Sequence, residues 1–234
     1  MPLILIDSVD STMNEIKKSK YDFYSAVAIL AKKQTEGRGR RNNKWISEPG
    51  NLFLSIRLKN RTLINHHLLS YMVSIIVFDA LKNYLNKNKK MFIKWPNDIH
   101  INNKKACGIL IEFLSSGNTI TDIIIGIGIN IQSNPKNINK LVTNLAMHCK
   151  KKIKILDLTK LVLSSLDYWI NMLVINKESI IDEWMKRSKH INSKIQFNFK
   201  NKLVVGLYKG ISTDGAIKVL VEGKTNKFFN LEFI

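Results

Sequence analysis

The stretch QTEGRGRRNNKWISEPG, residues 34–50, separates two apolar runs, residues 26–33 and 51–58, that are each typical of a β-strand. It is too long for a hairpin turn, and too basic and too rich in glycine for a helix or a strand. Loops of this length in compact domains are usually functional or disordered. We therefore expect two strands joined by an extended loop that carries function.

The middle of this loop places cationic side chains beside glycines. Three arginines and one lysine fall within residues 37–44, and guanidinium groups match the oxygens of carboxylates and phosphates. The glycines allow the backbone to approach a ligand closely, and Trp45 offers a flat face on which a purine can stack. The glycine spacing fits neither a Walker A loop nor a dinucleotide fingerprint. From the residues alone, a site for a small anion and a basic loop without such a ligand are both open.

A second group of polar residues is formed by KWPND, residues 94–98, and KACGILIE, residues 105–112. The proline and the Asn-Asp pair should end a strand over 91–95, and a hairpin is expected over 98–114. Lys105 lies close before a glycine, so its ammonium can be presented to a ligand, and Asp98 could orient a nucleophile. The alternative is a tight turn followed by an exposed hairpin lysine.

A third pattern is GIGIN, residues 126–130. Gly126 and Gly128 alternate, so they lie on one face of a strand and clear space there. Asn130 can offer both a donor and an acceptor to an adenine edge. Close packing between strands explains the glycines equally well.

The remaining pattern predicts an α+β fold with two domains. A helix capped by Ser11 or Thr12, with Thr12 and Glu15 in capping-box spacing, follows the first strand. From residue 191 the pattern changes to short β-rich runs with turns at 214–215 and 222–223, which is typical of a small antiparallel barrel. The domains expected are 1–188 and 189–234. The other elements expected are strands at 3–6 and 122–131, helices at 63–85, 156–174 and 177–188, and a last strand within 227–234.

Composition limits the class of protein. The chain has 234 residues, is 45% hydrophobic, and contains no apolar run that approaches the ~18 residues of a membrane span. The N-terminus lacks the basic region and cleavage site of a secretory signal. Two cysteines, Cys107 and Cys149, form no disulfide framework, so a cytoplasmic location is expected. The net charge of +19 favours contact with polyanions, but the lysines are scattered and are typical of a solvated surface.

The four motifs GRGRRNNKW, KWPND, KACGILIE and GIGIN occur in this order, and the array closely resembles the catalytic domain of biotin–protein ligases. The resemblance runs from about Leu3 through the C-terminal barrel. It implies a mixed sheet with flanking helices, as in class II synthetases, followed by a small SH3-like β-barrel. It also implies that the chain activates biotin with ATP and Mg²⁺ to biotinyl-5′-AMP. The biotinyl group would then pass to a lysine of the biotin carboxyl carrier protein of acetyl-CoA carboxylase.

The resemblance also assigns roles to individual residues. Lys105, Arg40 and Asp98 are implied as catalytic, and no residue is implied as a metal ligand. The residues implied to bind biotin are Ser11, Thr12, Gln34, Gly37, Arg38, Lys105 and Gly108. The residues implied to bind ATP or the adenylate are Arg38, Arg40, Arg41, Lys44, Trp45 and Asn130.

Three features depart from the family pattern. Met13 stands where many relatives have an asparagine, and Asn42 and Asn43 replace a common Gly-Arg pair. The chain begins almost directly at the first catalytic strand, so we expect a ligase that binds no operator and no specific nucleic acid. The lack of a long apolar run predicts no membrane partner, and the family resemblance leaves a homodimer open. Lipoate–protein ligase is the nearest alternative, and KWPND with GRGRR speaks against it. A basic nucleic-acid-binding module is another, suggested by the net charge of +19 and the C-terminal barrel; Phe228, Phe229, Lys224 and Lys227 give only a hint of the basic and aromatic face that it would need.

Overall fold

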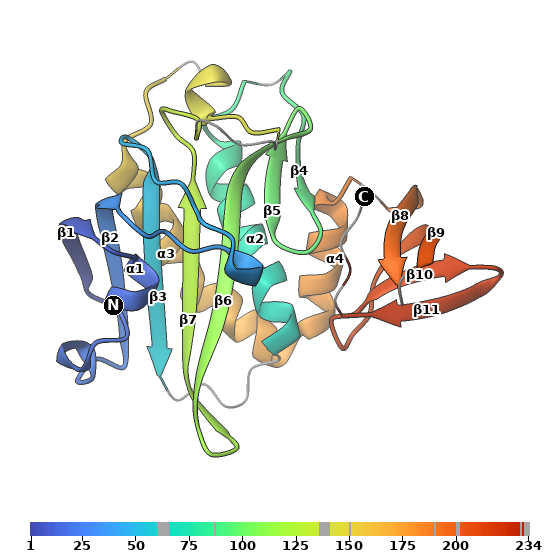
Figure 1. Ribbon diagram of the computed structural model, residues 1–234, viewed down its shortest axis with the longest axis horizontal. Helices are drawn as coiled ribbons and strands as arrows, with labels where there is room; N and C mark the ends of the chain where they lie inside the picture. The colour runs from blue at the N-terminus through green and yellow to red at the C-terminus, as the bar shows by residue number, and fades with distance from the viewer. Residues whose placement is uncertain are drawn as a thin grey trace.

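A seven-stranded sheet with the order β1-β2-β3-β7-β6-β5-β4 forms the centre of the protein (Figure 1). The structure is a computed structural model, which describes residues 1–59, 66–86, 88–135, 141–149, 151–189, 191–199, 202–229 and 231. β1 and β2 are parallel and the other neighbours are antiparallel, so the expected mixed sheet is confirmed. The strands are β1 (Leu3–Val9), β2 (Ala26–Gln34), β3 (Leu52–Lys59), β4 (Met91–Lys94), β5 (Asp98–Ile101), β6 (Lys104–Ser116) and β7 (Thr119–Ile129).

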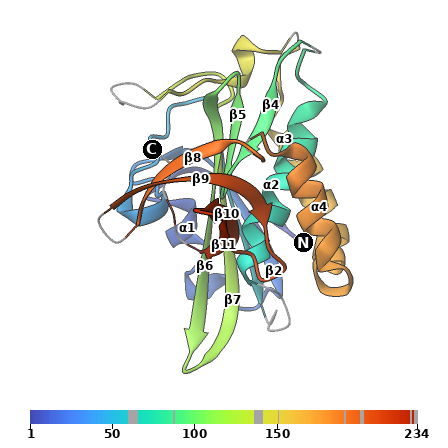
Figure 2. The same cartoon turned by 90° about the vertical axis from the view of Figure 1, so that its right-hand side faces the viewer.

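Three long helices cover one face of this sheet, and the short helix α1 (Thr12–Glu15) lies on the other (Figure 2). Side chains alternate along a strand, so Ile125, Ile127 and Ile129 of β7 face the helices and belong to the main core. Gly126 and Gly128 therefore face the opposite side, where α1 and the loop after β2 lie. The long helices are α2 (His66–Lys82), α3 (Ile155–Ile175) and α4 (Lys177–Arg187), and the short 3₁₀ segments are η1 (Ser19–Tyr21), η2 (Arg40–Asn42) and η3 (Leu145–Met147).

The start of α1 differs in detail from the capping box expected from the sequence. Ser11 is the N-cap, and its side chain accepts a hydrogen bond from the backbone N–H of Met13 at 3.3 Å. Glu15 does not return to the helix start. Its carboxylate instead accepts from the Tyr21 hydroxyl at 2.9 Å and pairs with Lys18 and Lys20. The expected capping box between Thr12 and Glu15 was therefore wrong, because the buried Glu15 carboxylate is bound by these three partners.

Two hairpins differ from the sequence prediction: the strands of one are longer, and the last strand of the other begins earlier in the chain. β6 and β7 continue to Ser116 and Thr119 around Gly117, because the polar residues there pair as strand although they resemble a loop in sequence. The last strand begins at Lys224 and not near 227. Glu222 and Gly223 both have positive φ (48° and 77°), which is the geometry of a two-residue hairpin turn. Residues 63–65 of the expected second helix and 232–234 of the last strand lie outside the described residues.

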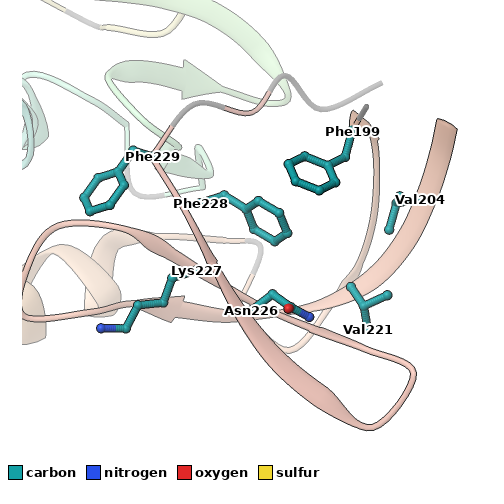
Figure 3. Close-up of a pocket in the computed structure, with 7 residues that line it drawn as sticks. All are labelled: Phe199, Val204, Val221, Asn226, Lys227, Phe228 and Phe229. Carbon is teal, nitrogen blue, oxygen red and sulfur yellow. The ribbon is translucent and has the colours of Figure 1, made fainter. Parts of the chain in front are cut away.

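The C-terminal segment forms a separate four-stranded antiparallel sheet with the order β11-β10-β9-β8, which fits the small β domain expected there. Its strands are β8 (Lys194–Phe199), β9 (Lys202–Ile211), β10 (Ile217–Val221) and β11 (Lys224–Phe228). Residues of this sheet line an open cavity of about 600 Å³ (Figure 3). The rings of Phe197 and Phe199 meet that of Phe228 at centroid distances of 5.2 and 5.1 Å; Phe197 is fully buried, whereas Phe199 is exposed at the cavity.

Helix α3 is the one helix among the described residues that is long and apolar enough to cross a membrane. Leu158, Val162, Leu166 and Ile170 recur every four residues along it and are buried. They belong to the main core, where α3 contacts α2 and α4. Packing within the domain therefore accounts for the apolar character of this buried face.

Candidate active site

The loop after β2 folds back on itself and lies over the sheet face opposite the long helices (Figure 1). We call residues 37–45 the flap. Its backbone is closed by hydrogen bonds from Trp45 N to Gly37 O at 2.8 Å and from Gly39 N to Asn43 O at 2.7 Å. Arg41 has a φ of 53° inside this turn, in the left-handed region that few residues other than glycine adopt. The flap is thus a hydrogen-bonded turn, and it places the Trp45 side chain on β6 and β7.

The indole of Trp45 lies directly on the two glycines that the sequence singled out. A Cβ added to Gly128 would meet the ring at Cζ2 and Nε1 (2.7 and 2.8 Å), and one added to Gly108 would meet Cζ3 at 2.8 Å. Glycine is therefore required at both positions for a flat ring to rest there. The Trp45 Nε1 atom is buried and has no hydrogen-bond partner among the described residues.

Lys105 and Asp98 meet beside Gly108 and Gly128, the two glycines under the Trp45 ring, which we call the glycine floor. Their Nζ and Oδ1 atoms are 2.8 Å apart, and both side chains are about one quarter exposed (28% and 26%). The Lys105 ammonium also lies 5.5 Å from the centre of the Trp45 ring. The flap and the strand lysine, which are far apart in sequence, therefore share one site, as the resemblance requires.

A cluster of hydrogen-bonding side chains lies on the neighbouring strands. The Gln34 Oε1 atom accepts from the Thr12 N–H at 2.8 Å and from the Thr12 hydroxyl at 3.0 Å. Ser55 donates to Thr12 Oγ1 at 2.8 Å, and Gln34 Nε2 donates to Ser47 Oγ at 3.0 Å. Thr12 and Gln34 were expected at a site for a polar ring, and the structure brings them together. Ser55 and Ser47 were not anticipated, although Ser55 is the one hydroxyl in the apolar strand β3.

The arginines of the flap have separate partners in this structure. Arg38 donates to Asn14 Oδ1 at 2.9 Å and pairs with Glu112 at 2.6 Å. Arg40 donates to Asn97 Oδ1 at 3.4 Å. Arg38 thus points toward α1 and β6, whereas Arg40 points toward the turn after β4. Glu112 and Asn97 lie inside motifs that the sequence identified, but neither had been given a role.

The other residues expected at the nucleotide lie around the flap. Asn130 is 2% exposed, its amide donates to Thr143 O at 3.2 Å, and its Oδ1 atom has no partner among the described residues. Arg41 and Lys44 are exposed on the flap. Asn130 therefore offers a buried acceptor, whereas these two cations face solvent.

The residue that replaces the family asparagine is part of the sheet face. Met13 is 3% exposed, and its Sδ atom would lie 2.6 Å from a Cβ added to Gly126. The amide of the neighbouring Asn14 donates to Asp10 at 3.1 Å, and its oxygen accepts from Arg38. The site is therefore apolar at Gly126.

His100, two residues after Asp98, gives the site region a pH-dependent stability. Burial lowers the pKa of His100 from 6.5 to about 4, although Asp98 opposes the shift. Between these two pH values the unfolded chain binds a proton at His100 that the folded chain excludes. The contribution of neutral His100 to the free energy of unfolding is therefore complete above pH 6.5 and is lost as the pH falls toward 4.

The ring of a His100→Phe variant can keep the contact with Phe92 (5.5 Å between centroids). Between pH 6.5 and pH 4 we expect this variant to lose roughly 3 kcal/mol less of its free energy of unfolding than wild type. Urea unfolding at a series of pH values measures the difference. Parallel acid dependence in the two proteins would show that His100 is not the group responsible.

Metal binding by the protein itself has little support in the described residues, where no group of three or more His, Cys, Asp or Glu side chains could hold an ion. Mg²⁺ usually keeps several waters and is held by one or two carboxylates together with substrate phosphates. The Asp98 carboxylate is already paired with Lys105. A magnesium ion would therefore be held mainly by the phosphates of a nucleotide, and we assign it no protein ligand.

Comparison with known proteins defines the class to which this fold and site belong. The model of the biotin/lipoate A/B protein ligase family matches residues 5–130, more than half of the chain, and the chain belongs to this family. Among its relatives, the biotin–[acetyl-CoA-carboxylase] ligase of Paracoccus denitrificans is 32% identical over 133 residues, which cover 56% of this chain and 55% of that protein. The bifunctional ligase/repressor BirA of Salmonella typhimurium is 27% identical over 223 residues, 92% of this chain and 68% of BirA.

Solved structures show the same similarity over the whole chain. The biotin protein ligase from Aquifex aeolicus in complex with biotin and ATP superimposes with a TM-score of 0.84 and 26% identity, covering 100% of this chain and 97% of that chain. The Leishmania major biotin protein ligase in complex with biotinyl-5-AMP has a TM-score of 0.69 at 23% identity, so it supports the fold alone. The expected α+β fold with a small C-terminal β domain is confirmed.

Proposed function

We propose that this chain joins biotin to ATP, forming biotinyl-5′-AMP and pyrophosphate, and then transfers the biotinyl group to a lysine of a biotin carboxyl carrier protein. One observation carries the proposal. The cationic flap and the Lys105–Asp98 pair meet over a glycine floor, beside the Thr12–Gln34 cluster. The Aquifex relative binds biotin and ATP on the same fold.

The first step joins two anions. An oxygen of the biotin carboxylate attacks the α-phosphorus of ATP, and the bond to the pyrophosphate oxygen breaks. Lys105 reduces the repulsion between the reactants and stabilises the negative charge that develops on the α-phosphate. Thr12, Gln34 and Ser55 offer hydroxyl and amide groups for the ureido ring, and we assign Trp45 to stacking on the adenine and Asn130 to hydrogen bonding with it. Mg²⁺ would neutralise charge on the phosphates when it is bound with ATP.

The second step is attack on the anhydride by the neutral amine of the carrier lysine, with AMP as the leaving group. Asp98 is partly exposed beside Lys105, so its carboxylate can accept a hydrogen bond from the amine and take up the proton that the nitrogen loses. The step needs no covalent intermediate with the protein. Burial raises the pKa of the Cys107 thiol, so this cysteine is unsuited to act as a nucleophile.

A single reconstitution tests the proposal. Purified protein is incubated with ATP, Mg²⁺ and either biotin or lipoate, and the mass of a biotin carrier domain is measured. We expect a biotinyl adduct on one lysine and no adduct with lipoate. A lipoyl adduct would support the lipoate ligase alternative, which family membership alone leaves open.

The flap arginine Arg40 should hold the intermediate and not create it. The Arg40→Gly variant is expected to form biotinyl-adenylate but to release it at least about tenfold faster, because a charge-assisted hydrogen bond is lost. The lifetime of labelled adenylate on the protein after rapid dilution measures this. An unchanged lifetime would remove Arg40 from the proposed retention of the intermediate.

We also propose that the chain does not recognise a DNA sequence. The described helices longer than one turn, α2, α3 and α4, all pack against one another in the core, and Lys227 of the C-terminal sheet pairs with Asp214 at 3.0 Å. With a net charge of +19, weak and steeply salt-dependent DNA binding is expected. Gel-shift titrations at several salt concentrations measure it. Tight, sequence-selective binding at physiological salt would contradict this part of the proposal.

Two further parts of the proposal concern the setting of the enzyme. A cytoplasmic location is supported by two free cysteines, Cys107 and Cys149, which are buried and half-buried. A homodimer stays a prediction.

A further inference from the structure

The buried hydroxyl of Tyr71 connects the two sheets of the protein. Tyr71 lies on α2 and is 2% exposed. Its hydroxyl accepts a hydrogen bond from Trp95 Nε1 at 2.8 Å and donates one to the carbonyl oxygen of Gly215 at 2.8 Å. Trp95 belongs to the KWPND turn, and Gly215 belongs to the turn between β9 and β10. One side chain therefore joins the site to the C-terminal module.

The turn at Gly215 is fitted closely to α2. Gly215 has a φ of +87°, and a Cβ added to it would lie 2.5 Å from the Cβ of His67. His67 and Tyr71 are four residues apart, so they lie on the same side of the helix. The turn is also held internally, because Gly215 N donates to Ser212 O at 2.8 Å. Only glycine allows this turn to rest on the helix.

At the other end, the connection continues to the flap. Asn97 follows Trp95 by two residues and is 7% exposed. Its side-chain amide donates to the carbonyl oxygen of Ile109 on β6, and its Oδ1 atom accepts from Arg40 at 3.4 Å. Arg40, Tyr71, Trp95, Asn97 and Gly215 all line a cavity of about 190 Å³ between the flap and the C-terminal module.

We infer that Tyr71 is a positioning residue: with Gly215 it fixes the KWPND turn so that Asn97 holds Arg40 over the bound adenylate. This inference rests on the proposed function. Burial raises the pKa of Tyr71 to about 12, so its hydroxyl keeps the proton it donates at any physiological pH. Within the part of the chain that the structure describes, the hydrogen bonds of the Thr12–Gln34–Ser55 cluster do not reach this connection, so binding of the biotin ring should not depend on it.

The test compares variants that change the hydrogen-bonded connection from Gly215 through Tyr71 to Trp95 with variants outside it. Tyr71→Phe removes the hydroxyl but keeps the ring beside Trp184 (5.1 Å between centroids). Gly215→Ala should push the turn away from His67. Gly223→Ala is the matched control, because Gly223 also has a positive φ (+77°) in the same module but has no atom within 4 Å of an added Cβ. The exposed Tyr168→Phe on α3 is the control for loss of a tyrosine hydroxyl.

Tyr71→Phe and Gly215→Ala are expected to shorten the lifetime of bound biotinyl-adenylate and to raise the KM for ATP by about fivefold to tenfold, the loss expected of one or two hydrogen bonds. Biotin affinity, measured calorimetrically without ATP, should be unchanged, and the two controls should match wild type. In the Arg40→Gly background the Tyr71→Phe substitution should have no further effect on adenylate lifetime, because the group that it positions is gone.

Three results would overturn the inference: an unchanged adenylate lifetime in Tyr71→Phe, an equal loss of biotin affinity, or an additive effect with Arg40→Gly. The wild-type reaction separates this failure from a failure of the proposed function. If wild type makes biotinyl-adenylate and Tyr71→Phe behaves identically, only the positioning role is wrong. If wild type makes no adenylate from biotin and ATP, the proposed function is wrong and the positioning role is rejected with it.

Discussion

Replacing Lys105 with alanine is expected to reduce biotinyl-adenylate formation by about 10²–10³-fold, the loss seen when one group that stabilises transition-state charge is removed. Lys105 is the cation that the structure places beside both the Trp45 ring (5.5 Å) and Asp98 (2.8 Å). Without its ammonium, the carboxylate of biotin and the α-phosphate would meet beside an unpaired Asp98. Repulsion would then replace attraction at the reacting atoms. Biotin-dependent release of pyrophosphate measures the rate.

Lys104→Ala is the matched control for this variant. Lys104 is the neighbouring residue on β6, is exposed and forms no ion pair among those described. It should release pyrophosphate at the wild-type rate. Carrier modification by Lys105→Ala supplied with chemically made biotinyl-5′-AMP should recover at least in part, since that route omits adenylation. Normal pyrophosphate release by Lys105→Ala would refute the role of this lysine.

The sequence predicted those parts of the site that local rules require. Alternation along a strand places Gly126 and Gly128 on one face, and a flat ring can lie only where side chains are missing. The structure shows that the ring lying on Gly128 and Gly108 is that of Trp45, a contact that the sequence did not predict. The individual strands were likewise expected from apolar runs separated by turn residues, whereas their union in one mixed sheet was implied only by the resemblance to biotin–protein ligases.

Other parts of the site depend on contacts between distant segments, and no local pattern indicates them. Ser55 reaches Thr12 across 43 positions, and Tyr71 reaches Gly215 across 144. Ser55 is the one hydroxyl of strand β3 and Tyr71 is one of several polar residues on α2, so the sequence alone singles out neither of them. The capping-box expectation at Glu15 was wrong for a more local reason, because Lys20 and Tyr21, which follow the helix closely, take up that carboxylate in the folded chain.

Gly128→Val tests whether the glycine floor is the surface on which the substrates react. The new side chain would collide with the indole of Trp45, since even a Cβ would approach Cζ2 and Nε1 to 2.7 and 2.8 Å. Trp45 must then leave the floor, and the flap with it. A displacement of about 1 Å at a reacting centre costs about 10²-fold in rate, so we expect a loss of adenylate formation of at least that size.

Gly128→Val could lower adenylate formation by displacing Trp45 or by colliding with the adenylate itself, and a second substitution separates these two causes. In a Trp45→Ala background the collision with the indole is absent. If the floor also supports the bound adenylate, Gly128→Val should still lower adenylate formation about tenfold or more, because a single buried steric conflict costs about 1–3 kcal/mol. Gly117→Ala is the control, because Gly117 lies in the open turn between β6 and β7; it should leave the rate of adenylate formation unchanged. If Gly128→Val were harmless once Trp45 is gone, the floor would serve only to seat the tryptophan, and the adenylate would have to lie elsewhere on this face of the sheet.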